Sequence, residues 1–517
     1  YIKMNSAMSN PNQPSGSGNL IPSVLIQNSA VNESQDSILN TVRLSPNSFS
    51  NNTSVFIIPK SGTVLDHNSS LVWSVSWDGY NDGNVDAQRV ALKQFSGALN
   101  TLQRARMYVG GRLLFTNQDV GQTVHIDKMS NNPDHLVEVE DIKLGSQHSY
   151  KFVADGKVEV GSDVATTNQG YNRLTRALGS YADLATDNKS FEATLLLHDI
   201  FPALKGGIQL PVKFLKEEVR IEIDFVTAFD SVALCTNVGG GLDSNVISIR
   251  NPLLYLDFLS YDPVVEAGIM ESMAEGISIP YREISYIQKQ LAPNANTPFS
   301  SDILLGFQGK LLMKIYVSHR FPSAIAGLDF GTGAAGGATI TGYERVNGRC
   351  RSNRGLNMAY NLIVNDIFIH DQNVDTASQQ YNFLSMTKQN PIYVYPNSFD
   401  TNRIWNVGVA ASDFNDSQIR IGGVARADGT LTAAAARDGF AGCQSYIGFD
   451  LSKYGPEGGI NPGNSGFRVG STPIILRIDQ NGGGVQTPQG GAKAVDVFCE
   501  SVKIMQIRNG MVDTIDA

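Results

Sequence analysis

Apolar and polar residues alternate along much of this chain, most clearly within the segment Phe191–Phe225. Residues 219–225 read VRIEIDF, so apolar and charged side chains take turns. A period of two is that of a β-strand with one face on a core and the other in water. The apolar run 193–197 predicts a second, buried strand, and QLP at 209–211 predicts the turn before the core strand. We therefore expect a β-sandwich corner whose charged face, Arg220 to Asp224, is free to meet a neighbour.

The same strand pattern recurs in both halves of the chain. Short alternating or apolar runs are separated by loops rich in Gly, Asn and Pro, which is typical of all-β proteins. Further strands are predicted at residues 55–59, 71–77, 104–115, 251–262, 277–288, 309–319, 357–370, 392–396, 445–451, 473–479 and 497–512. Gly110 and Gly111 lie in the middle of the third of these runs, which predicts a hairpin there.

Three segments are predicted to be helical, at residues 87–102, 117–130 and 263–276. Apolar residues in the first recur at helical spacing. The last has Pro263 in its first turn and Gly276 past its end, which are typical helix boundaries. We interpret this last helix as the connector between two domains.

The length of 517 residues exceeds what one hydrophobic core usually organises, so two cores are expected. The sequence predicts an N-terminal polar arm at 1–52, a first sandwich at 53–262, a helical connector at 263–278 and a second sandwich at 279–517. The arm is rich in Asn, Ser, Gln and Pro and cannot form a core alone. We expect it to be disordered or to become ordered against a neighbouring subunit. Duplication of one sandwich is a hypothesis at this point.

Composition and charge argue against several classes of protein. The net charge of -9 is small for this length and argues against a surface that coats nucleic acid. No run of about 18 apolar residues is present, which predicts no transmembrane span, and the first residues lack the pattern of a signal peptide. The four cysteines lie far apart without a CxxC motif, so we expect free thiols in a reducing compartment rather than a zinc or redox site.

Three short motifs suggest chemistry, but their contexts favour loops. GNSG at 463–466 is similar to the serine loop of trypsin-like proteases, yet Phe-Arg follows where those proteases usually have Gly-Pro. Residues 331–336 satisfy GxGxxG, but glycine and β-branched residues follow instead of a helix. DGYNDG at 78–83 fails as a calcium loop because Tyr80 and Arg89 occupy its third and twelfth positions.

We also interpret the histidines and tryptophans as structural rather than catalytic or ligand-binding residues. His198-Asp199 and His370-Asp371 end apolar strands, where adjacent side chains point to opposite faces, so neither suits acid–base catalysis. Trp73 and Trp77 share a face with apolar neighbours and are predicted to be core rather than a sugar platform. Glycosylation sequons, expected by chance in an Asn-rich chain, are present at Asn51, Asn68, Asn188 and Asn415. The sequence therefore predicts no catalytic, cofactor-binding or metal-binding residue.

One long stretch resembles a known family. HDIFPALKGGIQLPVKFLKEEVRIEIDF, residues 198–225, resembles a segment of the double jelly-roll major capsid proteins of polinton-like viruses, virophages and nucleocytoplasmic large DNA viruses. Further similar stretches follow the family order: SGTVLDHNSSLVW, FSGALNTLQRARMYVGGRLL, the helix at 263–276 with ISIPY after it, and VKIMQIRNGMV. Together they span residues 55–512, and the long loops at 131–190 and 323–356 depart from the pattern.

The resemblance implies an all-β fold of two tandem eight-stranded jelly-roll sandwiches with a few short helices. It implies a major capsid protein that forms homotrimers, which then contact neighbouring capsomers in the icosahedral shell of a double-stranded DNA virus. Expected partners are penton and minor capsid or cement proteins, with an internal membrane beneath the shell as a further candidate and no sequence-specific nucleic acid. The expected location is the virion, after assembly in the host cytoplasm or nucleus.

Two other readings remain open at this point. The first is a two-domain β-sandwich protein that binds glycans or a receptor. The second is a hydrolase with an unrecognised site, which loss of hydrolytic activity in Ser465→Ala would support. Within the capsid interpretation, a polar substitution at Ile221 is expected to abolish folding, whereas charge reversal at Glu222 is expected at most to weaken assembly.

Overall fold

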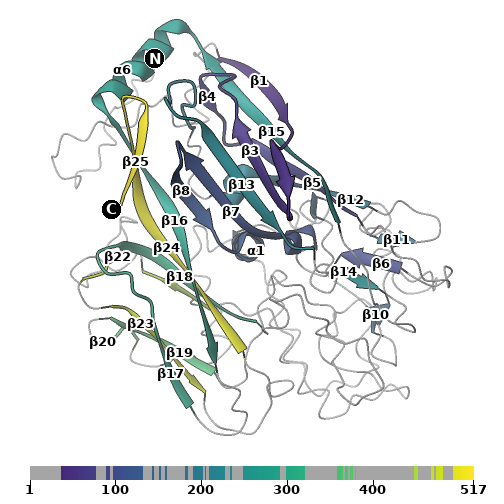
Figure 1. Ribbon diagram of the computed structural model, residues 1–517. Helices are drawn as coiled ribbons and strands as arrows, with labels where there is room; N and C mark the ends of the chain where they lie inside the picture. The colour runs from purple at the N-terminus through teal and green to yellow at the C-terminus, as the bar shows by residue number, and fades with distance from the viewer. Residues whose placement is uncertain are drawn as a thin grey trace, which may run out of the picture.

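The computed structural model contains two β-sandwiches joined by one helix (Figure 1). The residues that it describes are 37–76, 89–92, 97–131, 143–144, 151–152, 158–159, 181–183, 190–201, 204, 209–227, 233–235, 248–291, 299–320, 358–364, 367–370, 373–375, 379, 383, 447–451, 467–470, 473–480 and 493–516. The predicted strand at 392–396 and the first 36 residues of the predicted arm lie outside these ranges.

The first sandwich consists of two antiparallel sheets. In spatial order, one sheet contains β1 (Ser37–Leu44), β15 (Ser248–Tyr261), β5 (Ser70–Ser76) and β12 (Ser190–Leu196), with β4 (Val64–Leu65) also paired to β15. The other contains β2 (Ser48–Ser50), β3 (Thr53–Ile58), β13 (Val219–Phe225), β7 (Leu102–Val109) and β8 (Arg112–Asn117). Two small sheets are separate from these. The first contains β11 (Tyr181–Asp183), β6 (Arg89–Leu92) and β14 (Ala233–Cys235). The second contains β10 (Val158–Glu159) and β9 (Lys151–Phe152).

The second sandwich also consists of two antiparallel sheets. One contains β16 (Ile277–Leu291), β24 (Lys493–Arg508), β18 (Leu311–Arg320) and β21 (Ile447–Asp450), with β22 (Phe467–Arg468) paired to β18 and β25 (Met511–Asp516) paired to β24. The other contains β17 (Phe299–Leu304), β23 (Ile475–Gln480), β19 (Met358–Val364) and β20 (Ile367–Phe368).

The two sandwiches repeat one strand order. The order β1-β15-β5-β12 in the first corresponds to β16-β24-β18-β21 in the second, and β3-β13-β7-β8 corresponds to β17-β23-β19-β20. The corresponding strands also follow one another in the same sequence along the chain. Eight strands of each sandwich are thereby equivalent, which confirms the predicted double jelly roll and supports the duplication hypothesis at the level of topology.

Alternate side chains along the strands pack into the first core, as the sequence pattern predicts. Ile221 and Ile223 of β13 are fully buried, whereas Glu222 between them points to the other face of the sheet. Trp73 of β5 is also fully buried, and its indole N–H donates a hydrogen bond to Thr101 Oγ1 over 2.9 Å. The prediction that Trp73 belongs to the core is confirmed, while Trp77 lies outside the described residues.

The strands β16 and β24 form one long antiparallel ribbon that contributes to both cores (Figure 1). Their register runs from Ile277 opposite Ile507 to Leu291 opposite Lys493. One end of the ribbon supplies the first core with Ile277, Ile279, Tyr281, Met505 and Ile507. The other end supplies the second core with Leu291, Val495, Val497 and Cys499. The first sandwich is therefore completed by residues from the last part of the chain.

The hairpin between β24 and β25 is fixed against the first sandwich and the connecting helix. Asn509 N–H donates to the carbonyl of Met273 over 2.9 Å, and Lys216 N–H donates to the carbonyl of Gly510 over 2.8 Å. Gly510 has a φ of +75°, and a Cβ added there would lie 2.5 Å from the carbonyl oxygen of Phe214. Only glycine fits this turn without displacing the hairpin.

Two of the three predicted helices are confirmed. The helix α1 (Val120–Asn131) covers the predicted segment 117–130. The connector is α6 (Pro263–Glu275), in which the Asp262 side chain accepts a hydrogen bond from Val264 N–H and Pro263 stands in the first turn. None of the helices in the described ranges is long and apolar enough to cross a membrane.

The prediction of a helix at residues 87–102 is wrong. Residues 89–92 form β6, which pairs with β11 and β14, and residues 97–101 form a 3₁₀ turn. The apolar residues of this segment have helical spacing, but a short apolar run suits a strand as well, and strand pairing decides between them. Gly97 adopts a positive φ of 46°, which no continuous helix permits.

The prediction that the polar arm extends to residue 52 is also wrong, because residues 37–44 and 48–50 form strands. The strand β1 pairs with β15 along its whole length, from Ser37 opposite Tyr261 to Leu44 opposite Leu254, and β2 pairs with β3. Val42 and Leu44 pack against the first core. Composition suggested an arm because few residues here are apolar, yet an edge strand needs only one half-buried face. Residues 37–50 belong to the first sandwich.

Replacement of Gly510 by alanine tests the docking of the terminal hairpin. We expect Gly510→Ala to destabilise the protein by about 2–4 kcal/mol, because the new Cβ forces the turn away from Phe214. Gly111→Ala is the matched control: its φ is +84°, but nothing lies within 4 Å of the added Cβ, so only the backbone cost of about 1 kcal/mol applies. Denaturant unfolding of both variants measures the difference. Equal losses would show that the hairpin is not fixed there.

Candidate functional site

The helix α1 lies between the two sandwiches. It follows β8 directly, and the Asp119 carboxylate at its start accepts a hydrogen bond from Gln122 N–H over 3.3 Å. Val120 and Val124 on one side of the helix are buried in the first core. The helix is thereby held on the first sandwich, with its remaining side available to the second.

The other side of α1 packs on the outer face of the second sandwich. Ile126 is buried against Phe498 of β24, with the side chains of β16 and β18 around them. Gln122 donates a hydrogen bond to the hydroxyl of Ser318 of β18, and both residues are fully buried. Burial of an apolar pair and a polar pair from different sandwiches sets a fixed position for the junction.

A second part of the junction joins β8 to β16. The ring of Phe115 meets that of Tyr281 edge to face, with 4.6 Å between ring centroids. The hydroxyl of Tyr281 donates to the carbonyl of Leu114 over 3.4 Å. Burial, with nearby carboxylates, raises the pKa of Tyr281, so this hydroxyl keeps its proton at any physiological pH.

Charged side chains lie in the middle of the β16–β24 ribbon, between its two apolar ends. Lys503 Nζ lies 2.7 Å from Glu283 Oε1, and Lys310 Nζ lies 3.7 Å from Glu283 Oε2. The Glu283 side chain is 11% exposed. A largely buried carboxylate between two ammonium groups separates the first core from the second without leaving an uncompensated charge.

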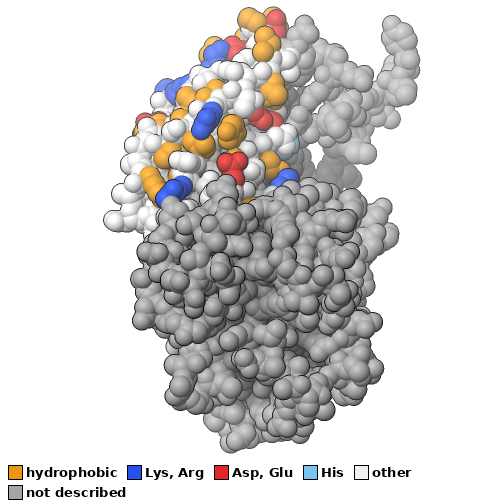
Figure 2. All heavy atoms as spheres, turned by 90° about the vertical axis from the view of Figure 1, so that its right-hand side faces the viewer, with side chains coloured by type: hydrophobic (Ala, Val, Ile, Leu, Met, Phe, Trp, Pro, Cys, Tyr) orange, Lys and Arg blue, Asp and Glu red, His pale blue; other side chains and the backbone are white. Residues whose placement is uncertain are grey.

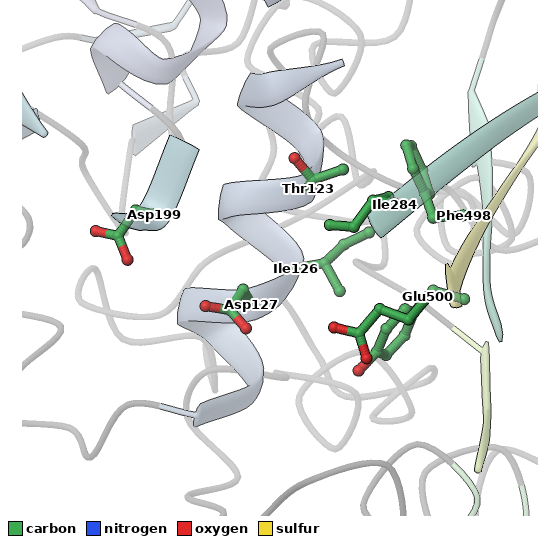
Figure 3. Close-up of a pocket in the computed structure, with 8 residues that line it drawn as sticks. Thr123, Ile126, Asp127, Asp199, Ile284, Phe498 and Glu500 are labelled. Atoms are coloured by element: carbon green, nitrogen blue, oxygen red, sulfur yellow. The ribbon is translucent and has the colours of Figure 1, made fainter. Parts of the chain in front are cut away.

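A pocket lies beside α1 at this junction (Figure 3). Its lining comes from both sandwiches: Thr123, Ile126 and Asp127 of α1, Asp199 of α4 (Leu197–Ile200), Ile284 of β16, Tyr316 of β18, and Phe498 and Glu500 of β24. The Glu500 carboxylate is paired with the guanidinium of Arg282 at 3.7 Å. Within the described ranges, no group of three or more His, Cys, Asp or Glu side chains is arranged to hold a metal ion.

The charged face of β13 is not free, contrary to the prediction. Asp224 Oδ2 lies 2.7 Å from Arg104 Nε, and Glu222 lies 3.1 Å from Arg106 and 3.2 Å from Arg220. The Glu222 and Asp224 side chains are only 14% and 12% exposed. The alternating pattern places these residues outside the core, but cross-strand ion pairs with β7 engage them within the same sheet.

The histidine candidates have structural surroundings. His198 and Asp199 lie in α4 rather than at a strand end, so they do not point to opposite faces, and His198 Nε2 is 3.6 Å from Asp199 Oδ1. His198 Nδ1 donates to the carbonyl of His67 over 3.0 Å. The ring of His370 contacts those of Phe383 and Phe449, and Asp371 lies outside the described residues.

Among the four cysteines, the structure describes the surroundings of the Cys499 thiol. Its thiol is free and completely buried in the second core, as the free-thiol prediction expected. Burial raises its pKa, which disfavours the reactive thiolate. The loops at 463–466, 331–336 and 78–83, and with them Ser465, lie outside the described residues.

The sequence did not point to the junction residues. Ile126 and Phe498 meet across more than 370 positions in the chain, and no local pattern links them. One signal was present: residues 494–499 are buried on both faces of β24, and their sequence AVDVFC has little of the polar alternation of a half-exposed strand. Such a run predicts a strand covered on both sides, though not by which element.

Comparison with known proteins identifies the fold. No protein-family model and no curated protein sequence matches the chain. Among solved structures, the chain is similar to PBCV-1 VP54 fitted into a cryo-EM reconstruction of the virophage Sputnik, with a TM-score of 0.53, 11% identity, and coverage of 93% of this chain and 97% of that chain.

Two further structures show the same similarity. A chain from the cryo-EM structure of the Sputnik virophage has a TM-score of 0.51, 11% identity, and coverage of 93% of this chain and 88% of that chain. The Faustovirus major capsid protein has a TM-score of 0.51, 10% identity, and coverage of 93% and 92% respectively. At such low identities these similarities establish the shared fold, a double jelly roll.

Charge reversal at Glu222 tests the ion pairs of the first sandwich. We expect Glu222→Lys to lower the free energy of unfolding by about 3 kcal/mol, because it places a third cation beside Arg106 and Arg220. Glu192→Lys, on the exposed face of β12, is the matched control and should change stability by less than about 0.5 kcal/mol. Thermal and denaturant unfolding measure both variants. A Glu222→Lys variant as stable as the control would contradict the ion-pair assignment.

Proposed function

We propose that this chain, which has the double jelly-roll fold of viral major capsid proteins, is a capsid subunit that assembles into homotrimers. The observation that carries the proposal is the repetition of one strand order in two adjacent sandwiches of a single chain. Two similar lobes per chain give six similar lobes in a ring of three chains. Such a ring has the outline of a hexagon and can tile a shell.

The junction within the chain supports closure into a ring. It is a head-to-tail contact, in which α1 of one sandwich meets the outer face of a sheet in the next, and β8 meets the end of β16. Head-to-tail contacts generate closed rings when the rotation between units divides a full turn. Permanent interfaces of this kind bury about 2,000–5,000 Å² in total.

The expected partners follow from the same proposal. Trimers would contact neighbouring trimers, penton proteins and minor capsid or cement proteins in a virion shell, with an internal membrane beneath it as a further candidate. The net charge of -9 suits dense packing of subunits and gives no basis for sequence-specific binding of nucleic acid. No catalytic role is part of the proposal.

We also propose the domain division that accompanies this function. The first jelly roll, with its start moved to residue 37, extends to residue 262, the connector covers 263–278, and the second jelly roll covers 279–517. The division is one of chain order. Most of the ribbon, from residue 279 onward, belongs to the second unit in sequence, but one of its ends contributes to the first core.

The glycan-binding alternative gains no support from the tryptophan that suggested it. Trp73 is fully buried and hydrogen-bonded to Thr101, so it offers no face to a sugar ring. The capsid proposal accounts for the paired lobes, whereas a glycan-binding protein would need only one.

The mass of the purified protein in solution tests the proposal. One chain has a mass of 55.9 kDa, so a trimer is expected near 168 kDa, three times that value. Size-exclusion chromatography with light scattering, over a hundredfold range of protein concentration, measures it. A stable trimer that also forms shells or sheets at high concentration supports the proposal. A monomer at every concentration would contradict it.

A further inference from the structure

The repeated strand order relates the two ribbons of the molecule. The pair β1–β15 in the first sandwich is equivalent to the pair β16–β24 in the second. In both pairs the first strand begins beside the end of its partner: Ser37 stands opposite Tyr261, and Ile277 stands opposite Ile507. The contacts made by this end of the second ribbon therefore indicate which contacts the equivalent end of the first ribbon can make.

In the second ribbon, this end is covered by the neighbouring sandwich. Ile277, Ile279 and Tyr281 extend beyond the second core on the side of β16 that carries Leu291, and all three are buried in the first core. Tyr281 meets Phe115 of β8 at 4.6 Å between ring centroids. The strand end thus docks beside the β7–β8 hairpin of the adjacent unit.

In the first ribbon, the same end carries exposed apolar side chains. Ile38 is 72% exposed, although alternation places it on the side of β1 that carries Val42 and Leu44, which pack against the first core. Leu39, on the opposite face, is 59% exposed. Ile38 extends past its own core as Ile279 and Tyr281 extend past theirs.

The second sandwich carries the matching exposed group. The strand β20 is the equivalent of β8, since each forms a hairpin with the strand before it, β19 or β7. Phe368 of β20 is 43% exposed, and the guanidinium of Arg477 lies over its ring at 5.3 Å. By hairpin register Phe368 stands at the position of Leu113, on the outer face of the sheet, two residues before the position of Phe115. It is an exposed aromatic side chain on the strand equivalent to the one that receives β16 within the chain.

From these positions we infer that the N-terminal end of β1 docks, in a second copy of this chain, beside β20 of the second sandwich. Ile38 of one copy then lies near Phe368 of the next, repeating between copies the contact that β16 makes with β8 within one copy. Both contacts are head-to-tail, so three copies close into a ring of six units. The inference rests on the proposed trimer and names the surfaces that form it.

The surface around β1 is compatible with a second copy. Figure 2 shows this side of the first sandwich, where hydrophobic side chains lie among separate basic and acidic ones. Thr41 donates a hydrogen bond to Asp257 over 2.6 Å on the outer face of the same strand pair. Among the described residues on this face, basic and acidic side chains are interspersed, which is compatible with the approach of an identical chain.

Cross-linking between copies tests the inference directly. The double variant Ile38→Cys/Phe368→Cys, treated with a short bismaleimide, should give covalent dimers and trimers on a denaturing gel. Glu192→Cys/Phe368→Cys is the matched control, because Glu192 is exposed on β12, at the opposite edge of the sheet from β1. The wild-type protein reports on reaction of the native cysteines. Cross-linking confined to the first variant supports the inference.

A second measurement needs no engineered thiol. Ile38→Asp should raise at least tenfold the protein concentration at which half of the chains are trimeric, whereas Glu192→Lys should leave it unchanged. Thermal unfolding should be the same for both variants, since both positions are exposed in the monomer.

The outcomes separate this inference from the proposed function. A trimeric wild type, combined with no specific cross-link and no effect of Ile38→Asp, would overturn the inference and leave the trimer in place. A wild type that is monomeric at every concentration would overturn the proposed function and the inference together.

Discussion

The antiparallel pairing of β16 with β24 is the interaction on which the rest of the structure depends. Its register fixes which side chains face the cores, and one set of alternating positions serves both. Ile279 enters the first core and Leu291 the second, with Glu283 between them paired to Lys503. A slip of one residue would turn both apolar sets toward the wrong face at once. The two sandwiches therefore cannot pack independently of each other.

This shared ribbon also explains why the junction has a fixed geometry. The strand β24 carries Val497 toward its own core on one face and Phe498 toward α1 on the other. The helix α1 in turn contributes to the first core through Val124. The second unit thus contributes residues to the first core, and the helix of the first packs on the outer face of the second. The angle between them follows from packing rather than from a linker. A subunit with two lobes at one fixed angle suits a shell, in which every contact repeats.

Much of the fold could be predicted from the sequence because local patterns encode strands and helix ends. Alternation in 219–225 predicted β13, and Pro263 with Gly276 predicted α6. Where prediction failed, distant partners decided the outcome. Residues 89–92 have helical spacing but pair as a strand, and 37–44 look like a polar arm but complete a sheet. The candidate site was the least predictable part, because it depends on contacts between α1 and β24, far apart in the chain.

Electron microscopy of the purified protein tests most directly the central claim, that two equivalent lobes at a fixed angle build a closed ring. The account predicts class averages with six lobes of similar size around a three-fold axis, in which first and second sandwiches alternate. Isolated two-lobed particles at all concentrations would contradict it. So would a trimer in which the three second sandwiches meet at the axis and the first sandwiches point outward.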